Sequence, residues 1–270
     1  MRQPEEEGKM AILERSDTGA VARLTLNQPE KLNPLSDEML AALQSTFEEL
    51  ANDSSIRAII LSGAGKAFCA GHDLKQMTAA RAGEDGGRAY FKDLFDRCAT
   101  MMQTVQRLPQ PVIAEVHGIA TAAGCQLVAS CDMAVAATGT RFGVNGVNIG
   151  LFCSTPMVAL SRNIPRKQAF EMLTTGQFIS AERAEALGLV NRVVAPENLQ
   201  TETEALANMV AEKLGVAVKI GKEAFYKQLE MGLSDAYDYT GDVMVENMLH
   251  RQTEAGIEAF LEKRKPEWDQ

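Results

Sequence analysis

The sequence predicts an α/β protein whose sheet is mainly parallel. Short apolar runs, typical of buried strands, alternate along the chain with longer stretches of helical periodicity. The clearest runs, 56–61 and 112–116, lack the polar alternation of a strand with one face in water. We therefore expect helices on both faces of a sheet, and a core that spans residues 11–196.

The chain is expected to begin with a β-hairpin and a helix. Two short segments of alternating polarity, 11–14 and 21–26, flank the turn-forming sequence at 17–20. After a loop with two prolines, Ser36 can cap a helix N-terminus with its hydroxyl group. The acidic residues 37–38 suit the positive end of that helix, which should run to about residue 51.

Strands and helices then alternate as far as residue 194. The strand 56–61 ends in a glycine-rich loop, and a charged helical stretch follows until Pro109 and Pro111 stop it. Small residues open the next helix after a second buried strand. The expected elements are helix 87–108, strand 112–116, helix 124–130, strand 133–137, helices 156–162 and 166–174, and strand 192–194.

Beyond about residue 197 the strand signal disappears and helical periodicity continues, with breaks expected near Gly215, Gly232 and Gly241. We expect residues 197–270 to form a helical appendage. Its apolar stripes need a partner, which can be the main body or a neighbouring chain. The stripes include Met244, Met248, Ile257, Phe260 and Leu261. Residues 1–10 should form a flexible acidic tail.

Composition argues against several functional classes. Lys and Arg number 27 against 36 Asp and Glu, and the net charge of −9 repels nucleic acid and anionic lipid. No apolar run approaches the roughly 20 residues that span a bilayer. We therefore expect neither a nucleic-acid partner nor a membrane partner.

The cysteines and histidines predict neither disulfides nor a metal site. Five Cys form no C-x-x-C pair, and three His show no ligand spacing. Reduced thiols fit a cytoplasmic protein. The mitochondrial matrix is the alternative if a presequence has been removed.

The loop SGAGKAFCAGHDLKQM (62–77) follows a buried strand. It contains neither a phosphate loop nor a dinucleotide-binding glycine pattern. A turn at 70–72 could direct backbone N–H groups outward, although plain turn geometry would also explain the glycines. His72 and Asp73 are adjacent, so their side chains point apart and cannot form a catalytic pair. The His72 side chain is expected near the surface.

The stretch ATAAGCQLVASCD (120–132) has the same layout: a buried strand, small residues and a helix start near Gly124. A helix N-terminus exposes unpaired N–H groups, and small residues let a ligand oxygen reach them. Close packing of a helix on a sheet would equally favour Ala and Gly. Together, the two loops suggest two N–H donors that converge on one oxyanion.

KAFCAGHDL (66–74) and HGIATAAGCQLVASCDMAVA (117–136) closely resemble the oxyanion-hole segments of the crotonase, or enoyl-CoA hydratase/isomerase, superfamily. TLNQPEKLNPLS (25–36) and FLEKRKPEW (260–268) are similar to the ends of that family, so the resemblance covers residues 10–268. It implies a crotonase/ClpP-like spiral of ββα units over 11–196. It also implies a C-terminal trimerisation region, 197–270, in a homotrimer or a hexamer built as a dimer of trimers.

The resemblance also implies a site for an acyl-CoA thioester. The backbone N–H groups of His72 and Ala123 would hold the thioester oxygen. Coenzyme A would be part of the substrate, with no permanently bound cofactor and no metal. Its adenine and pantetheine would lie along the backbone of Ala70, Gly71, His72, Asp73 and Leu74. Cations would come from Lys31 or Lys75 and from Lys263 of the helical region, in the same or a neighbouring subunit.

The sequence departs from the family where hydratases carry two catalytic glutamates. It has Gln126 at the first position and Gly146 at the second. Neither residue can titrate, so hydratase (lyase) activity of the kind used in fatty acid metabolism should be weak. Ser154 falls where dienoyl-CoA isomerases carry an acid. Other neutral candidates for a role in proton transfer are Asn145, Asn148, Cys125 and Cys153.

Two alternatives to hydration remain open at this point. One is different acyl-CoA chemistry, such as decarboxylation of a malonyl-type thioester or thioester hydrolysis. Decarboxylation needs little base catalysis, because loss of CO₂ itself generates the enolate that an oxyanion hole stabilises. The other alternative is a non-catalytic acyl-CoA binding or regulatory protein.

Overall fold

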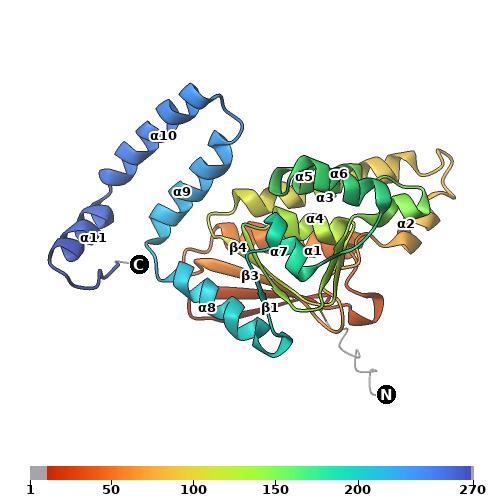
Figure 1. Ribbon diagram of the computed structural model, residues 1–270, viewed down its shortest axis with the longest axis horizontal. Helices are drawn as coiled ribbons and strands as arrows, with labels where there is room; N and C mark the ends of the chain where they lie inside the picture. The colour runs from red at the N-terminus through yellow and green to blue at the C-terminus, as the bar shows by residue number, and fades with distance from the viewer. Residues whose placement is uncertain (1–10, 269–270) are drawn as a thin grey trace, which may run out of the picture.

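The computed structural model describes residues 11–268, so the tail expected at 1–10 lies outside the described residues (Figure 1). Within this range the main sheet has six strands in the order β1-β2-β3-β4-β6-β9. The hairpin strands are antiparallel and all other pairs are parallel. The mainly parallel α/β arrangement is therefore confirmed. The strands are β1 (Leu13–Thr18), β2 (Val21–Leu26), β3 (Ala58–Gly63), β4 (Val112–Val116), β6 (Met133–Ala137) and β9 (Arg192–Val194).

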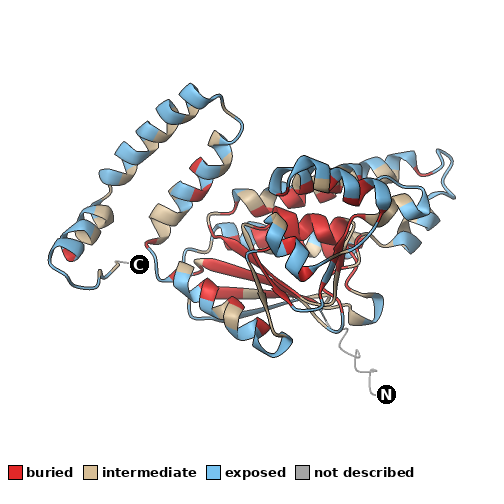
Figure 2. Ribbon diagram, viewed as in Figure 1, coloured by how far each residue is buried: buried red, intermediate tan, exposed pale blue. Residues whose placement is uncertain are grey.

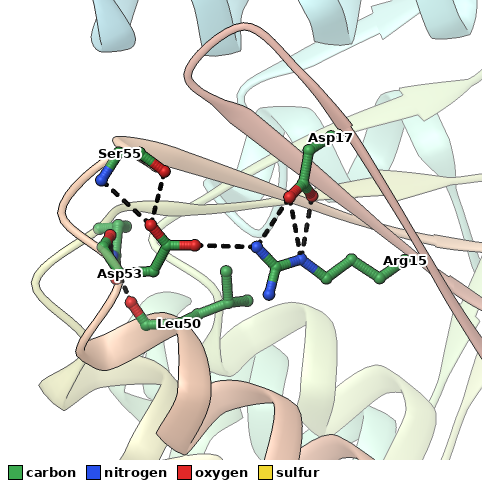
Figure 3. A network of polar contacts seen from close by, with 6 residues as sticks. Arg15, Asp17, Leu50, Asp53 and Ser55 are labelled. Atoms are coloured by element: carbon green, nitrogen blue, oxygen red, sulfur yellow. Dashed lines mark hydrogen bonds and ion pairs between the residues drawn. The ribbon is translucent and has the colours of Figure 1, made fainter.

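The first strand of the hairpin is longer than expected and carries a polar network on its exposed side (Figure 3). Arg15 pairs with Asp17 on the same strand, at 2.8 Å, and with Asp53, at 3.0 Å. Asp53 follows α1 (Asp37–Ala51) and also accepts a hydrogen bond from the Ser55 hydroxyl at 2.6 Å. The network ties the hairpin to the segment that connects α1 with β3.

Helices cover both faces of the sheet, as expected. One core lies under α1, α3 (Arg88–Arg107) and α4 (Ala123–Ser130), and a second lies under α8 (Leu199–Ala211). Side chains of β3 alternate between them: Ile59 and Leu61 face the first core, Ala58 and Ile60 the second. Figure 2 shows the inner strands β3 and β4 together with α4 as the most buried elements. Although α8 lies within residues 197–270, it packs on the sheet.

A second sheet contains β5 (Ile119–Thr121), β7 (Arg141–Gly143) and β8 (Ile179–Ser180). The sequence analysis did not predict it, because strands of two or three residues are too short to show periodicity. Two turns of the chain each place one strand in the main sheet, the next strand in the second sheet, and then a helix. These turns are β4-β5-α4 and β6-β7-α5, with α5 at Ser154–Asn163.

Isolated bridges continue this second layer into the preceding turns of the chain. Cys69 pairs with Ala120 of β5, and Leu35 pairs with His72, both in parallel. The molecule is therefore a spiral of ββα units, as the resemblance implied. The stacking also brings the loop after β3 against the loop after β4.

The predicted helices are all present, with small changes at their ends. Two short helices were not predicted: α2 (Leu74–Ala80) and α7 (Ala181–Leu187). Asp73 caps α2 by accepting hydrogen bonds from the N–H groups of Lys75 and Gln76. The remaining elements are α6 (Arg166–Thr175) and the 3-10 helices η1 (Pro29–Lys31), η2 (Asn145–Ile149) and η3 (Pro196–Asn198).

Residues 215–268, which we call the arm, extend away from the body (Figure 1). The arm contains α9 (Gly215–Gln228), α10 (Leu233–Met248) and α11 (Arg251–Leu261). A break predicted near Gly241 is wrong, because α10 continues through that glycine. Large apolar side chains of the arm are exposed, Phe260 at 80% and Leu261 at 72%. Within residues 11–268, no helix is both long and apolar enough to cross a membrane.

Candidate active site

A cavity of about 650 Å³ opens where the loops after β3 and β4 meet. One wall is formed by η1, the segment 70–75 and the side chains of Met77 and Phe95. We call this the η1–α2 wall. Further lining residues belong to η2 and to residues 151–156, and we call this part the η2–α5 wall. Residues 121–123 lie between the two walls.

The two loops are in direct contact at Gly71. Its φ of +90° is a conformation that glycine adopts without strain. A Cβ atom on Gly71 would lie 3.1 Å from the Thr121 carbonyl oxygen and 3.3 Å from the Ala123 nitrogen. The backbones can approach this closely because residue 71 has no side chain.

Two backbone N–H groups border the cavity without a partner. His72 and Ala123 both line it. Neither N–H group donates a hydrogen bond to any atom of residues 11–268. Ala123 is the first residue of α4, where an N–H group has no intrahelical acceptor. The geometry thus brings together the two donors that the sequence analysis placed at an oxyanion hole.

Ala122 itself has a strained backbone conformation. It lies at φ 50° and ψ −119°, which costs a non-glycine residue about 1–3 kcal/mol. Its own N–H group is fixed by a 2.9 Å hydrogen bond to the Gly143 carbonyl oxygen. Gly124 has a packing role, because a Cβ there would lie 2.3 Å from the Cys69 carbonyl oxygen. The small residues therefore serve both close helix packing and the exposure of the Ala123 N–H group.

The His72 side chain is only partly exposed, and its ring is more buried than expected. Its ring meets the Phe95 ring edge-on at 5.8 Å, and Nδ1 lies 3.3 Å from the Leu35 carbonyl oxygen. Nε2 is buried without a partner among residues 11–268. Burial lowers the pKa of the imidazole, so the ring stays neutral at neutral pH. As expected, the neighbouring Asp73 points elsewhere, because it caps α2.

Two of the three predicted cations lie at the cavity. The exposed side chains of Lys31 and Lys75 line the η1–α2 wall, together with Glu30, Asp73 and the residues Ala70 and Leu74. Gly71 is behind this wall and does not line the cavity. Lys263 follows the end of α11 and does not line the cavity of its own chain.

The two positions of the hydratase glutamates differ in their surroundings. Gln126 is 5% exposed and does not line the cavity, and its Oε1 has no hydrogen-bond partner in residues 11–268. Gly146 lies on the η2–α5 wall. A Cβ on Gly146 would be 2.3 Å from the Leu151 carbonyl oxygen and 2.9 Å from Cys153 Sγ. The loop thus fills the space that a side chain at residue 146 would need.

The other neutral candidates are mostly engaged in structural contacts. Asn145 accepts a hydrogen bond from the Thr121 hydroxyl, and Asn148 donates one to the Gly176 carbonyl oxygen at 3.2 Å. Ser154 is exposed on the first turn of α5 and donates to the Phe152 carbonyl oxygen at 3.4 Å.

Neither cysteine near the site is an activated thiol. Cys125 is fully buried away from the cavity, and burial raises the pKa of its thiol to about 12. Burial also raises the pKa of the Cys153 thiol, which lines the η2–α5 wall. Both thiols stay protonated near neutral pH, so neither provides a ready nucleophile.

Sequence reasoning missed the apolar part of the η2–α5 wall. Ile149, Leu151 and Phe152 line the cavity and are 64%, 45% and 37% exposed. Three large apolar residues around Gly150, in a segment with no strand or helix pattern, were an available signal. In the described part of the chain, no group of three or more His, Cys, Asp or Glu residues could hold a metal ion.

The sequence was compared with known protein families and with individual proteins. The family described as enoyl-CoA hydratase/isomerase matches residues 16–270. Enoyl-CoA hydratase domain-containing protein 3, mitochondrial, of Xenopus laevis is 48% identical over 248 residues, which are 92% of this chain and 83% of that protein.

Solved structures agree with this comparison. The human enoyl-CoA hydratase domain-containing protein 3 has a TM-score of 0.91 at 45% identity and covers 96% of this chain and 100% of its own. An enoyl-CoA hydratase of Mycobacterium smegmatis has a TM-score of 0.92 at 54% identity, again covering 96% and 100%.

Proposed function

The chain belongs to the enoyl-CoA hydratase/isomerase family, and from that premise we propose that it binds an acyl-CoA thioester in the cavity. The N–H groups of His72 and Ala123 hold the thioester carbonyl oxygen. One observation carries the proposal. These two donors have no partner among residues 11–268 and border the same cavity, and they come from two loops that are in contact. Such donors stabilise negative charge that develops on a carbonyl oxygen.

The coenzyme A part of the ligand lies along the η1–α2 wall. Its adenine and pantetheine follow the backbone of residues 70–74, and its phosphates meet Lys31 and Lys75. These two exposed cations supply local positive charge in a protein whose net charge is −9. Lys263 of a neighbouring subunit adds another cation. Coenzyme A enters and leaves with the substrate, and the site needs no permanently bound cofactor.

The reaction at this site is not efficient hydration. Proton transfer to or from water needs a group that titrates, and Gln126 and Gly146 cannot do so. Ser154 offers only an exposed hydroxyl group. What remains is stabilisation of an enolate or a tetrahedral thioester intermediate by the two backbone donors.

Calorimetric titration of the full chain with butyryl-CoA, crotonyl-CoA and free coenzyme A tests the proposal. The thioesters should bind about tenfold more tightly than coenzyme A, because only they supply a carbonyl oxygen to the two donors. Equal affinities would contradict the role of His72 and Ala123. CO₂ or free thiol released from an acyl-CoA panel would identify decarboxylation or hydrolysis, and binding without turnover would identify a binding protein.

The exposed apolar residues of the arm support assembly as a homotrimer or a dimer of trimers. Sedimentation equilibrium of the full chain would contradict this if it gave the mass of a monomer. All five cysteines are buried and unpaired, which supports a reducing compartment. That compartment is the cytoplasm or the mitochondrial matrix, and the named Xenopus relative is mitochondrial.

A further inference from the structure

We infer that the acyl group taken by this cavity carries a carboxylate beyond its thioester carbonyl, as a malonyl or succinyl group does. The inference rests on the proposed function and narrows its substrate class. It starts from the η2–α5 wall, where every residue that lines the cavity is uncharged. The acidic residues that line the cavity, Glu30 and Asp73, belong to the η1–α2 wall.

The η2–α5 wall offers hydrogen-bond donors without acceptors. The Oδ1 atom of Asn145 accepts from the Thr121 hydroxyl, whereas its Nδ2 donates to no atom of the described chain. The N–H group of Thr155, in the first turn of α5, also donates to nothing in residues 11–268. A ligand group that accepts several hydrogen bonds would pair with these free N–H donors. A carboxylate is such a group, because each of its two oxygens accepts hydrogen bonds.

Two helix N-termini border the same cavity. Ala122 and Ala123 begin α4, and Cys153 and Ser154 begin α5, and all four residues line the cavity. Neither helix has a side-chain cap. Their partial positive ends favour an anion without the presence of a cation. One end serves the thioester oxygen, and the other is free for a second negative group.

Gln126 adds a neutral position next to the cavity. It is 5% exposed and does not line the cavity, and its Oε1 has no hydrogen-bond partner in residues 11–268. It follows Ala122 and Ala123 by four and three residues, so it shares their face of α4. At this position the chain therefore brings no negative charge near the acyl group.

Residues 126 and 146 explain why a carboxylate on the acyl group is tolerated. Two glutamates, as in the family's hydratases, would repel a carboxylate on the acyl group. Gln126 and Gly146 remove both charges. Asn145 lies beside Gly146 and is joined to residue 121 of the oxyanion loop, so its free amide is close to where the acyl group continues beyond the carbonyl.

The first experiment is calorimetric titration of the full chain with malonyl-CoA, butyryl-CoA and free coenzyme A. Malonyl-CoA should bind at least about tenfold more tightly than butyryl-CoA, whose acyl group has similar size and no charge. If butyryl-CoA binds equally or better, the inference is wrong while the proposed function stands. If neither binds more tightly than coenzyme A, both are contradicted.

The second experiment places a negative charge at the wall. Asn145→Asp, nearly equal in size, should weaken malonyl-CoA binding at least about tenfold and leave butyryl-CoA within about twofold. Asn208→Asp is the matched control, because Asn208 is exposed on α8 at the other face of the sheet. It should change neither affinity.

Equal losses for both ligands in Asn145→Asp would mean a distorted pocket and would contradict the inference. Should that variant fail to fold by circular dichroism, Asn145→Ala removes the donor without adding a charge. It should weaken malonyl-CoA alone. An unchanged preference between the two acyl-CoAs in Asn145→Ala would likewise contradict the inference.

Discussion

Lys222 Nζ lies 2.7 Å from Asp132 Oδ2 and joins α9 of the arm to the body. Lys222 is 8% exposed and also donates to the carbonyl oxygens of Val105 and Gln110, each at 2.9 Å. Tyr226 donates to the other oxygen of Asp132 at 2.8 Å. The root of the arm is therefore fixed by a buried charged pair whose members each have further hydrogen-bond partners.

Breaking this pair should strongly destabilise the protein. Lys222→Met removes the cation and leaves the Asp132 carboxylate buried, which typically costs about 3–5 kcal/mol. The free energy of unfolding in urea measures this loss. Lys219→Met is the control, since Lys219 is exposed on the same helix and its change should stay within about 0.5 kcal/mol. Similar values for both variants would show that the pair contributes no net stability.

Gly71→Ala should impair ligand binding through the contact between the two loops. The new methyl group would lie 3.1 Å from the Thr121 carbonyl oxygen and 3.3 Å from the Ala123 nitrogen, so the loops must move apart by a few tenths of an ångström. We expect about a tenfold loss of acyl-CoA affinity in calorimetry, because both oxyanion donors would be displaced.

Gly139→Ala is the matched control for this variant. Gly139 also has a positive φ, +83°, but a Cβ there would meet nothing within 4 Å. Both substitutions cost about 1–2 kcal/mol for the left-handed backbone conformation. Only Gly71→Ala should lower the affinity. If both variants lost affinity, the cause would be general destabilisation and not the contact between the two loops.

The sequence predicted the parallel sheet and the convergence of the two loops, because long apolar runs and the glycines of a tight contact leave clear patterns. It did not predict the second sheet, whose strands are too short for periodicity. It also underestimated the burial of the His72 ring, because that burial depends on Phe95, which belongs to a helix distant in the sequence. The obstruction at Gly146 comes from the nearby Leu151 backbone, which returns against it in a segment without a strand or helix pattern in the sequence.

His72 should make stability depend on pH. Burial lowers the pKa of its ring in the folded state, so the unfolded chain binds more protons below about pH 6.5. The contribution to stability is therefore present above this pH and is lost as the pH falls toward the folded-state value. His72→Gln should show a smaller loss of unfolding free energy than the wild type between about pH 7.5 and about pH 5.

The matched control is His117→Gln, at a residue whose Nε2 lies 2.9 Å from the Gly65 carbonyl oxygen. It should retain the pH dependence of the wild type. Urea titrations of the wild type and both variants, at about pH 7.5 and about pH 5, measure the change in unfolding free energy. If His72→Gln has the same pH dependence as the wild type, then the ring is accessible to protons and solvent in the folded state.

Restoring the two glutamates should not restore hydration. The wild type should hydrate crotonyl-CoA at least about 10²-fold more slowly than a hydratase with both glutamates. Gln126→Glu is nearly isosteric and should fold, although burial will raise the pKa of the new carboxyl group. Gly146→Glu must displace the Leu151 backbone, because its Cβ would start 2.3 Å from that carbonyl oxygen. We therefore expect the double variant to hydrate crotonyl-CoA no faster than Gln126→Glu alone and to be less stable. Initial rates and urea titration would measure the two effects.

The opposite result would be a double variant whose hydration rate lies within about tenfold of that of a true hydratase. It would show that the loop at residues 146–151 moves readily and that only the two carboxylates were missing.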